Sequence, residues 1–533
     1  MKHHQFPTAL RAAARGFAPR AVICPLVQSC NAQPESAKLR LDQHGSDVII
    51  SKLHSGASGD AGLRREVRRV VCSPSKVPVP CRFMTSRFLR YDPMVRSFRH
   101  AAAIAAASAL SLATLALSAS AADLAGNCCA DLEERIAELE ATTARKGNRK
   151  VSLTVSGQVN KALLLWDDGS ESNAYVVGNK NDQTNFGIAG DAKIAPGVTA
   201  GYEIVLRLLD NLSDGVDQTL SRGDTGFDLW QAHWFIESET LGKVSVGKAS
   251  RVTDTAPEAD FSEAGVAGYA GVQDVGGGFF LRRKDGALAD VAWGDIYSHF
   301  NGDTANLVRY DSPSFGGFVV SASWGEDDIW DAGIRYAYEG NGINFEAVVA
   351  YTEVTDEGGE PGRVDEDTVV GSASILHEAS GLNFTVAAGQ KSNNVAVADL
   401  DGVTRAQDDA KFIYVKAGWI AKLNALGPTA FYGEYGVFED FISAGADAGV
   451  VASLASGASG CVAAGAACRV TGNEADVWGF GVVQHIEAAE MQLYLGYRRH
   501  SADFDLVDGA GGAAGTAQLE DFDTVISGAK ISF

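Results

Sequence analysis

Two sets of charged side chains are the part of this sequence best suited to act on a solute. The acidic set lies in the long segment 250–277 and comprises Asp254, Glu258, Asp260 and Glu263. The basic set lies in segments of alternating polarity and comprises Arg207, Arg309 and Arg335. Opposite charges across a narrow, water-filled space create a field that orients dipolar solutes and sets ion preference. The alternative is that 250–277 is an ordinary solvated surface loop and that the arginines are solvated too. Which of the two holds depends on how the elements that carry the two sets are arranged.

Catalytic chemistry has much weaker support in this sequence. Nucleophilic catalysis needs a nucleophile, a base and an orienting acid in one place. The histidines on predicted strands, His233, His377 and His485, have no motif partner. The sequence also shows no metal-ligand cluster, phosphate loop or dinucleotide fingerprint. We therefore expect no enzyme activity, no catalytic residue, no metal and no cofactor.

The chain divides into two parts by charge. Residues 1–100 hold 17 Lys and Arg against 6 Asp and Glu, which leaves 28 against 61 for the remainder. At the junction, a basic segment from Met94 precedes an apolar run over 101–117 and an A-x-A site ending at Ala121, the order found in secretory signal peptides. A transmembrane helix is the alternative, but the run is Ala-rich and lacks a basic stop-transfer flank.

Three expectations follow for the domain organisation. Residues 1–93 are a non-native, disordered N-terminal extension, residues 94–121 are a signal peptide, and the mature protein starts near Ala122. The strongly acidic balance of the mature part excludes nucleic acid as a partner.

Residues 122–149 are expected to form a periplasmic leader that contains a short coiled coil. Within 130–146, apolar residues follow one another at spacings of four and three, with charged residues between them: Leu132, Ile136, Leu139 and Thr143. This is two heptads of an amphipathic helix, which is marginal in isolation. The helix is either a solvated tail or a short bundle at an oligomer axis, and we favour the bundle.

Two cysteines are candidates for a disulfide bond. Without residues 1–93 the number of cysteines falls from eight to four. Cys461 and Cys468 lie in a stretch rich in Gly, Ala and Ser and could close a short loop in an oxidising compartment. The sequence leaves open whether they are bridged.

From Val151 to the end, apolar and polar residues alternate with period 2, which predicts β-strands. Charged residues fall on the polar face of most strands, as a water-filled interior requires. Lys161 is an exception, and either a bulge at Gly157 or a subunit contact could explain it. The predicted strands are 151–160, 186–194, 198–208, 229–236, 244–246, 305–311, 316–324, 331–339, 342–351, 366–377, 381–390, 409–421, 426–437, 475–486, 490–499 and 521–533.

The connections indicate how these strands are arranged. Short turns alternate with long polar segments, as in a transmembrane barrel with short turns on one side and long loops on the other. The mature part has no apolar run near the twenty residues that a spanning helix needs, so a membrane protein of this sequence must be a closed barrel. Aromatic residues near predicted strand ends suit the membrane interfaces: Trp166, Trp324, Tyr351, Tyr435 and Tyr497.

Several segments resemble the alphaproteobacterial (rhizobial-type) general porins. The resemblance is most specific in 305–324, ANLVRYDSPSFGGFVVSASW, and in the alternating final strand that ends at Phe533. Segments 131–162, 185–208 and 241–250 resemble the same family, so the match covers most of 122–533.

The resemblance implies a trimer of 16-stranded antiparallel barrels in the bacterial outer membrane. It also implies that a third loop, here 250–277, folds inward and narrows the pore, which would place the acidic and arginine sets across the constriction. Residues 278–294 are either part of this loop or a further wall hairpin, so 18 strands are the alternative.

The implied function is passive diffusion of small hydrophilic solutes and ions through the pore. Outer-membrane lipid and lipopolysaccharide are expected partners, and peptidoglycan is a further candidate. The alternative function is structural, with the coiled-coil leader tethering the membrane to the cell wall.

Overall fold

The computed structural model describes residues 150–533, apart from 326–328, 356–365, 394–395, 400–401, 456–460, 462–467 and 509–510. In the earlier part of the chain it describes the backbone of β1 (Arg40–His44), β2 (Asp47–Lys52) and β3 (Glu66–Val70), which pair as a small antiparallel sheet. This sheet belongs to a separate unit, Met1–Asp92. The predicted signal peptide and coiled coil lie outside the described residues.

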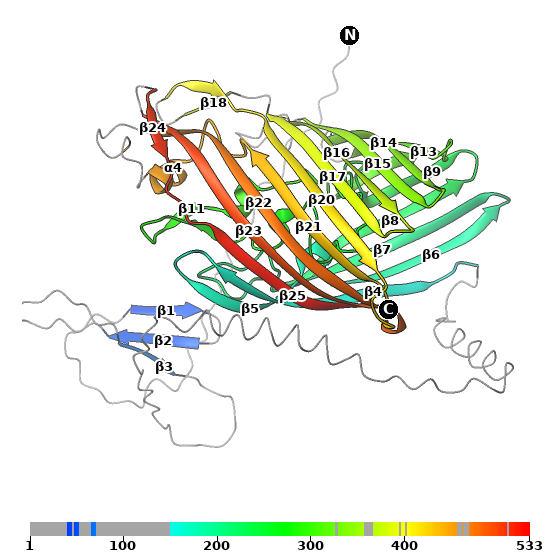
Figure 1. Ribbon diagram of the computed structural model, residues 1–533, viewed down its shortest axis with the longest axis horizontal. Helices are drawn as coiled ribbons and strands as arrows, with labels where there is room; N and C mark the ends of the chain where they lie inside the picture. The colour runs from blue at the N-terminus through cyan, green and yellow to red at the C-terminus, as the bar shows by residue number, and fades with distance from the viewer. Residues whose placement is uncertain are drawn as a thin grey trace, which may run out of the picture. The chain divides into compact units, whose positions relative to one another are not determined.

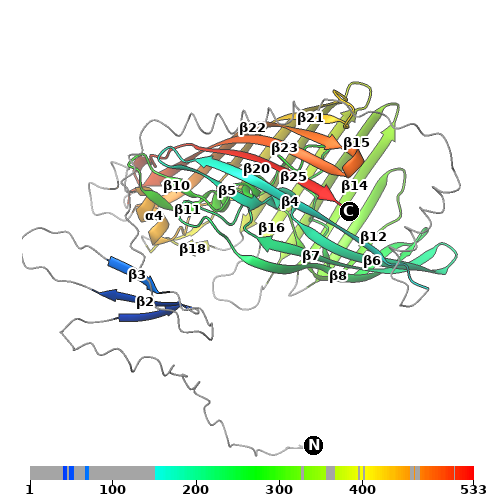
Figure 2. The ribbon, with the colours of Figure 1, turned by 90° about the horizontal axis from the view of Figure 1, so that it is seen from below.

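Most of the strands from β4 onward form the wall of a closed antiparallel barrel (Figure 1, Figure 2). Its first half comprises β4 (Thr154–Asp167), β5 (Ser172–Gly178), β6 (Asn185–Ala195), β7 (Val198–Asp210), β8 (Thr225–Ser238), β9 (Gly242–Ser250), β12 (Thr304–Asp311), β13 (Phe318–Gly325) and β14 (Ile329–Gly340). Its second half comprises β15 (Ile343–Val354), β16 (Glu366–His377), β17 (Leu382–Asn393), β20 (Ala410–Ala421), β21 (Thr429–Glu439), β22 (Arg469–Ile486), β23 (Met491–Val507), β24 (Ala513–Thr516) and β25 (Phe522–Ser532).

The wall has 16 strands, as predicted. β5 pairs with the later part of β4 and β6 with its earlier part, so these two elements are halves of one wall strand interrupted by a 3-10 turn. β24 and β25 divide the length of β23 in the same way. The hairpin of β10 (Phe280–Arg282) and β11 (Leu288–Ala292) forms a separate two-stranded sheet, so the 18-strand alternative is wrong.

The first and last wall strands close the cylinder. β25 pairs with β4 from Asp523↔Asp167 to Ser532↔Gln158 without a register shift. The backbones of Gly157 and Phe533 exchange two further hydrogen bonds at 3.0 and 3.1 Å. The alternating final strand is therefore an integral part of the wall.

Alternation places large apolar side chains on the outer face of the wall. Val176 and Phe227 are 70% and 73% exposed, and Trp324, Val349 and Trp419 also lie on this face. Such a surface would be unusual in water but suits contact with lipid. Trp166, in contrast, is buried and packs inside the barrel against Tyr175 and Phe279, so its assignment to an outer aromatic belt is wrong.

The connections gather at two ends. In Figure 1, β18, β24 and α4 lie at one end of the barrel and the C-terminus at the other. Two connections break the predicted alternation of short and long. β4 and β5 are joined by residues 168–171 alone, because β5 takes up most of the segment 167–183 predicted to be a long loop, and β13 and β14 are joined by residues 326–328 alone. The smaller elements are η2 (Lys180–Asp182), η3 (Val272–Asp274), α3 (Trp293–Ile296), β18 (Ala396–Ala398), β19 (Thr404–Ala406), α4 (Ala448–Ala455) and η4 (Glu487–Ala489). Among the described residues, no helix has the length and apolar character needed to cross a membrane.

Candidate functional site

The connection from β9 to β12, residues 251–303, lies against the inner face of the wall. We call it the third loop. The N–H groups of Ala259 and Phe261 donate hydrogen bonds of 2.9 Å to the hydroxyls of Ser372 and Ser374 on β16. The Ser372 hydroxyl in turn donates to the carbonyl of Ala256 at 2.6 Å. The loop therefore extends the inner wall by binding to inward-facing side chains.

Buried charges on the wall bind the middle of this loop. Arg498 on β23 donates to the carbonyls of Tyr269 and Val272 at 3.0 and 3.3 Å while it is paired with Glu434 on β21. The hydroxyl of Tyr414 donates to the same Glu434 carboxylate at 2.5 Å. A carbonyl bound by a charged donor forms a stronger hydrogen bond than one bound by a neutral group. This arrangement, which we call the Arg498 clamp, fixes the loop.

A second clamp is formed by Lys416 on β20. Its ammonium donates to the Asp260 carboxylate at 2.6 Å and to the carbonyl of Gly268 at 2.9 Å. Lys416 is 1% exposed. Asp260, one of the four predicted pore acids, therefore points into the wall, and the cation opposite it lowers the pKa of its carboxyl.

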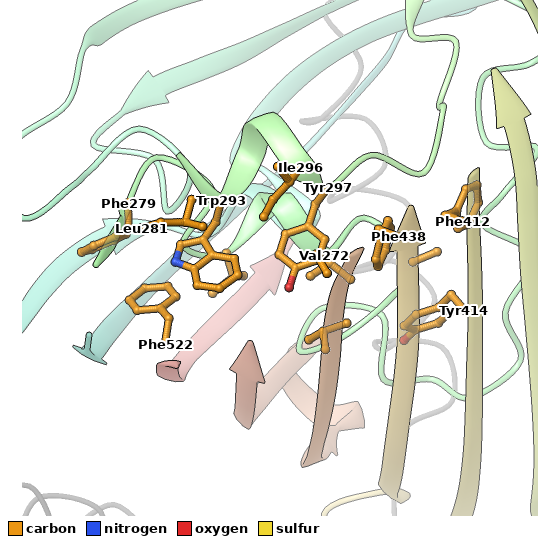
Figure 3. Close-up of a cluster of buried hydrophobic side chains, with 14 of the residues drawn as sticks. Val272, Phe279, Leu281, Trp293, Ile296, Tyr297, Phe412, Tyr414, Phe438 and Phe522 are labelled. Atoms are coloured by element: carbon orange, nitrogen blue, oxygen red, sulfur yellow. The ribbon is translucent and has the colours of Figure 1, made fainter. Parts of the chain in front are cut away.

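The end of the third loop forms an aromatic core with the wall (Figure 3). Trp293, the first residue of α3, and Tyr297, which directly follows this helix, stack with ring centroids 5.8 Å apart. Tyr297 meets the edge of Phe438 at 4.8 Å, and Trp293 stacks on Phe522. Aromatic pairs of this kind add to the free energy gained by burial alone.

The β10–β11 hairpin joins this core to the other long loops. Arg282 forms a buried ion pair with Asp168 at 2.7 Å, and Arg283 donates to the carbonyl of Ser453 in α4 at 2.8 Å. The backbone N–H of Glu520 donates to the carbonyl of Arg282 at 2.7 Å. The third loop thus contacts the inner wall from β16 through β25 to β4, and it is bonded to three other connections.

The remaining predicted acids occupy three environments. Asp254 is 6% exposed, and burial raises the pKa of its carboxyl, as do the neighbouring charges of Glu258 and Asp303. Glu258 accepts a hydrogen bond of 3.1 Å from the Nε2 atom of His299. Glu263 is the most exposed of the four, and its carboxylate lies 3.6 Å from Nε2 of His485.

The three predicted arginines project inward from the wall but have different partners. Arg309 pairs with Asp311 at 2.8 Å and also donates to the carbonyl of Arg251. Arg335 pairs with Glu346. Arg207 instead lies over the ring of Trp230, 3.6 Å from its centroid.

The structure also places the other candidate residues. The Nε2 atom of His233 lies 3.9 Å from a carboxylate oxygen of Glu203. His377 is hydrogen-bonded to the Ser380 hydroxyl at a turn, and His485 is hydrogen-bonded to the carbonyl of Glu263 in the third loop. Cys461 and Cys468 form a disulfide with Cα atoms 5.7 Å apart. Within the described ranges, no group of three or more His, Cys, Asp or Glu side chains could hold a metal ion.

Comparison with protein-family models settles the family. A model described as Gram-negative porin matches residues 102–505. The chain belongs to the Gram-negative porin family. A porin with a closed barrel and an apolar outer face is an outer-membrane protein, so the loop end of the barrel faces the medium and the turn end faces the periplasm.

Individual relatives of this porin are distant. A chitoporin from Vibrio furnissii is 36% identical over 70 residues, which span 13% of this chain and 19% of that protein. Among solved structures, OmpT of Vibrio cholerae is similar with 10% identity and a TM-score of 0.44, covering 73% of this chain and 99% of that one. An anion-selective porin from Comamonas acidovorans has 15% identity and a TM-score of 0.43, covering 72% and 100%.

Proposed function

We propose that this porin is a water-filled channel for passive diffusion of small hydrophilic solutes and ions, narrowed by its third loop. The observation that carries the proposal is the closed barrel with residues 251–303 bound to its inner wall. The resemblance of 305–324 to rhizobial-type general porins supports a narrower assignment to that group.

Conductance of the purified protein in planar bilayers tests this function. We expect stepwise, ohmic channels, because an open lumen conducts in proportion to voltage. A folded preparation that gives no channels would overturn the proposal. The acidic set on the third loop also predicts a mild preference for cations, and a reversal potential that favours chloride would contradict that part.

We further propose a homotrimer, with β25 and β4–β7 as the subunit contact. Lys161 and Asp210 form an ion pair of 2.5 Å on the outer face, and both remain at least 38% exposed in the single chain. The register of β4 with β25 is continuous, so the bulge suggested for Lys161 is wrong. A charge on the lipid face costs about 2–4 kcal/mol at mid-membrane, which favours burial of this pair between subunits.

The distribution of aromatic side chains supports the same contact. Exposed Trp and Tyr residues occur on β8, β12–β14 and β20–β22: Trp234, Tyr310, Trp324, Trp330, Tyr338, Trp419, Tyr435 and Trp478. Among the described residues, β4–β7 and β25 carry none. Aromatic belts mark lipid contact. If the proposal holds, Lys161→Met should shift native mass spectra of the detergent-solubilised protein from trimer to monomer, whereas Lys411→Met, an exposed outward lysine on β20, should leave the trimer intact.

Lipopolysaccharide contact and attachment to peptidoglycan are further proposals. The second rests on the predicted coiled coil, residues 130–146. Deletion of these residues should release the protein from sacculi while conductance persists, if tethering is a second role. We also infer that the barrel lacks hydrolase activity, and labelling by a serine-reactive probe would contradict this.

A further inference from the structure

His500 on β23 is a buried histidine without a hydrogen-bond partner. It is 1% exposed, and both of its ring nitrogens lack a partner among the described residues. The centroid of its ring lies 5.5 Å from those of Trp293 and Tyr297 and 5.6 Å from that of Phe522. His500 therefore belongs to the aromatic core between the end of the third loop and the wall (Figure 3). Buried polar atoms are nearly always hydrogen-bonded, so this exception requires an explanation.

The charged and titratable groups around His500 do not favour a cation at this position. On β23, Arg498 lies two residues away on the same face, and its positive charge acts on the imidazole. From the third loop, the Tyr297 hydroxyl already donates to the carbonyl of Asp476 at 3.0 Å. The carboxylates of the flanking strands, Asp476 on β22 and Asp523 on β25, point to the outer face of the wall, where each accepts a hydrogen bond from a tyrosine. A neutral imidazole is therefore the form that fits this core.

Burial of a neutral imidazole makes the packing of the loop end depend on pH. When the loop end leaves the wall, His500 lies in water, and an exposed imidazole binds a proton below about pH 6.5. The released state therefore binds the proton more tightly than the packed state, so the packed state loses stability as the pH falls. Each pH unit below this value shifts the balance about tenfold toward the released state, as long as the packed imidazole remains neutral.

We propose that His500 is an acid-sensitive switch that releases the end of the third loop. Protonation forces its ring out of the aromatic core, and residues 293–297 then detach from the wall and enter the lumen, which narrows the channel. Trp293 packs on both His500 and Phe522, so loss of one ring contact weakens the other. The middle of the loop stays on the wall, because the Arg498 clamp and the second clamp, at Lys416, bind it. The narrowing rests on the proposed channel function, whereas the release itself does not.

Cleavage by pepsin, which is active in acid and cuts at aromatic residues, tests the release. Trp293 and Tyr297 are each 1% exposed, so they become accessible only after release. His500→Phe keeps an aromatic ring of similar size but cannot take up a proton. The ratio of the wild-type to the His500→Phe cleavage rate at 293–297 should rise about tenfold from about pH 4.5 to about pH 3.5. The ratio cancels changes in pepsin activity and in groups that titrate equally in both proteins.

Two further variants complete the test. His500→Leu is a second neutral variant and should give the same ratio as His500→Phe. His377→Phe is the matched control, because His377 lies at a turn and is bonded to Ser380, and it should be cleaved like the wild-type protein. Equal cleavage of the wild-type protein and both His500 variants at both pH values would overturn the switch.

Single-channel records in planar bilayers test the narrowing. Wild-type and His377→Phe channels should close in steps as the pH is lowered over the same range, while His500→Phe channels stay open. Acid closure that is the same in His500→Phe, or a wild-type channel that stays open in acid, would overturn this part. Absence of channels at neutral pH would instead reject the channel function, and the pepsin ratio would still decide whether the loop end is released.

Discussion

Arg498 and Glu434 form a bidentate ion pair beneath the third loop, with Nε–Oε1 and Nη2–Oε2 distances of 2.7 and 3.1 Å. Arg498 is 3% exposed, and the same guanidinium donates to two carbonyls of the loop. Because Glu434 neutralises this guanidinium and the third loop covers it, Arg498 contributes little to the electric field in the open lumen.

Removal of one partner from this pair should destabilise the barrel strongly. In Glu434→Ala, Arg498 is left buried without a counter-charge, which costs about 3–5 kcal/mol. Arg499→Ala is a matched control on the adjacent residue, since Arg499 pairs with Asp521 on the exposed outer face and such pairs contribute about 0–1 kcal/mol. Thermal unfolding in detergent, followed by circular dichroism, measures both. Equal losses of stability would contradict the role of the clamp.

A side chain at Gly268 should loosen the third loop. A Cβ atom there would lie 2.7 Å from the ring of Tyr432 on β21, so Gly268→Ala must move the loop or the ring. We expect larger current fluctuations in single-channel records. Gly265→Ala serves as the control, because its Cβ would meet only the Asp260 carboxylate at an ordinary 3.7 Å. Equally small current fluctuations in both variants would mean that the contact of Gly268 with Tyr432 does not restrain the loop.

Stability should depend on the protonation of Asp214 in the connection between β7 and β8. Burial raises the pKa of its carboxyl from 3.8 to about 6. The folded state therefore binds the proton more tightly than the unfolded state, and this stabilisation is complete below pH 3.8 and is lost as pH rises through 6. Asp214→Asn should thus stabilise the protein by about 1–2 kcal/mol at pH 8 and have no effect near pH 3.5. Chemical unfolding at both pH values tests the sign, and a stabilisation that is larger at low pH would refute it.

The disulfide in the connection between β21 and β22 should be detectable in protein from native membranes. Cleavage after Lys422 and Arg469 releases one peptide that contains Cys461 and Cys468. Before reduction this peptide should be lighter by two hydrogens and resist alkylation, and after reduction it should accept two alkyl groups. Alkylation without reductant would show that the two thiols are free.

Alternation in the sequence predicted the strands of the wall, and the resemblance to rhizobial-type porins decided the choice of 16 strands over 18. Strict alternation, as in Val198 to Leu208, fixes which side chains face lipid, and all sixteen predicted segments correspond to wall strands. Predicted strand ends were less accurate. β22 and β23 extend beyond the predicted segments 475–486 and 490–499, because residues 469–474 of β22 pair with residues 503–507 of β23.

The interior was harder to predict because it depends on contacts between distant segments. Nothing near Asp260 indicates that Lys416 will bind it, since 155 residues separate them along the chain. In the sequence, the only sign of the two clamps is a charged residue on the inward face of a strand, as at Arg498. Alternation of polarity does not distinguish a charge that lines a pore from a charge that binds a loop. Trp230 was missed because a bulge interrupts the period that the prediction relies on.

Closure of the wall by β4 and β25 has a consequence for biogenesis. Until β25 is in place, β4 and β23 each present a row of unpaired amide groups, and such edges readily join other chains. An unfinished barrel would therefore need chaperoning during its passage across the periplasm. A chain that lacks its last ten residues would keep those edges open and be a target for degradation.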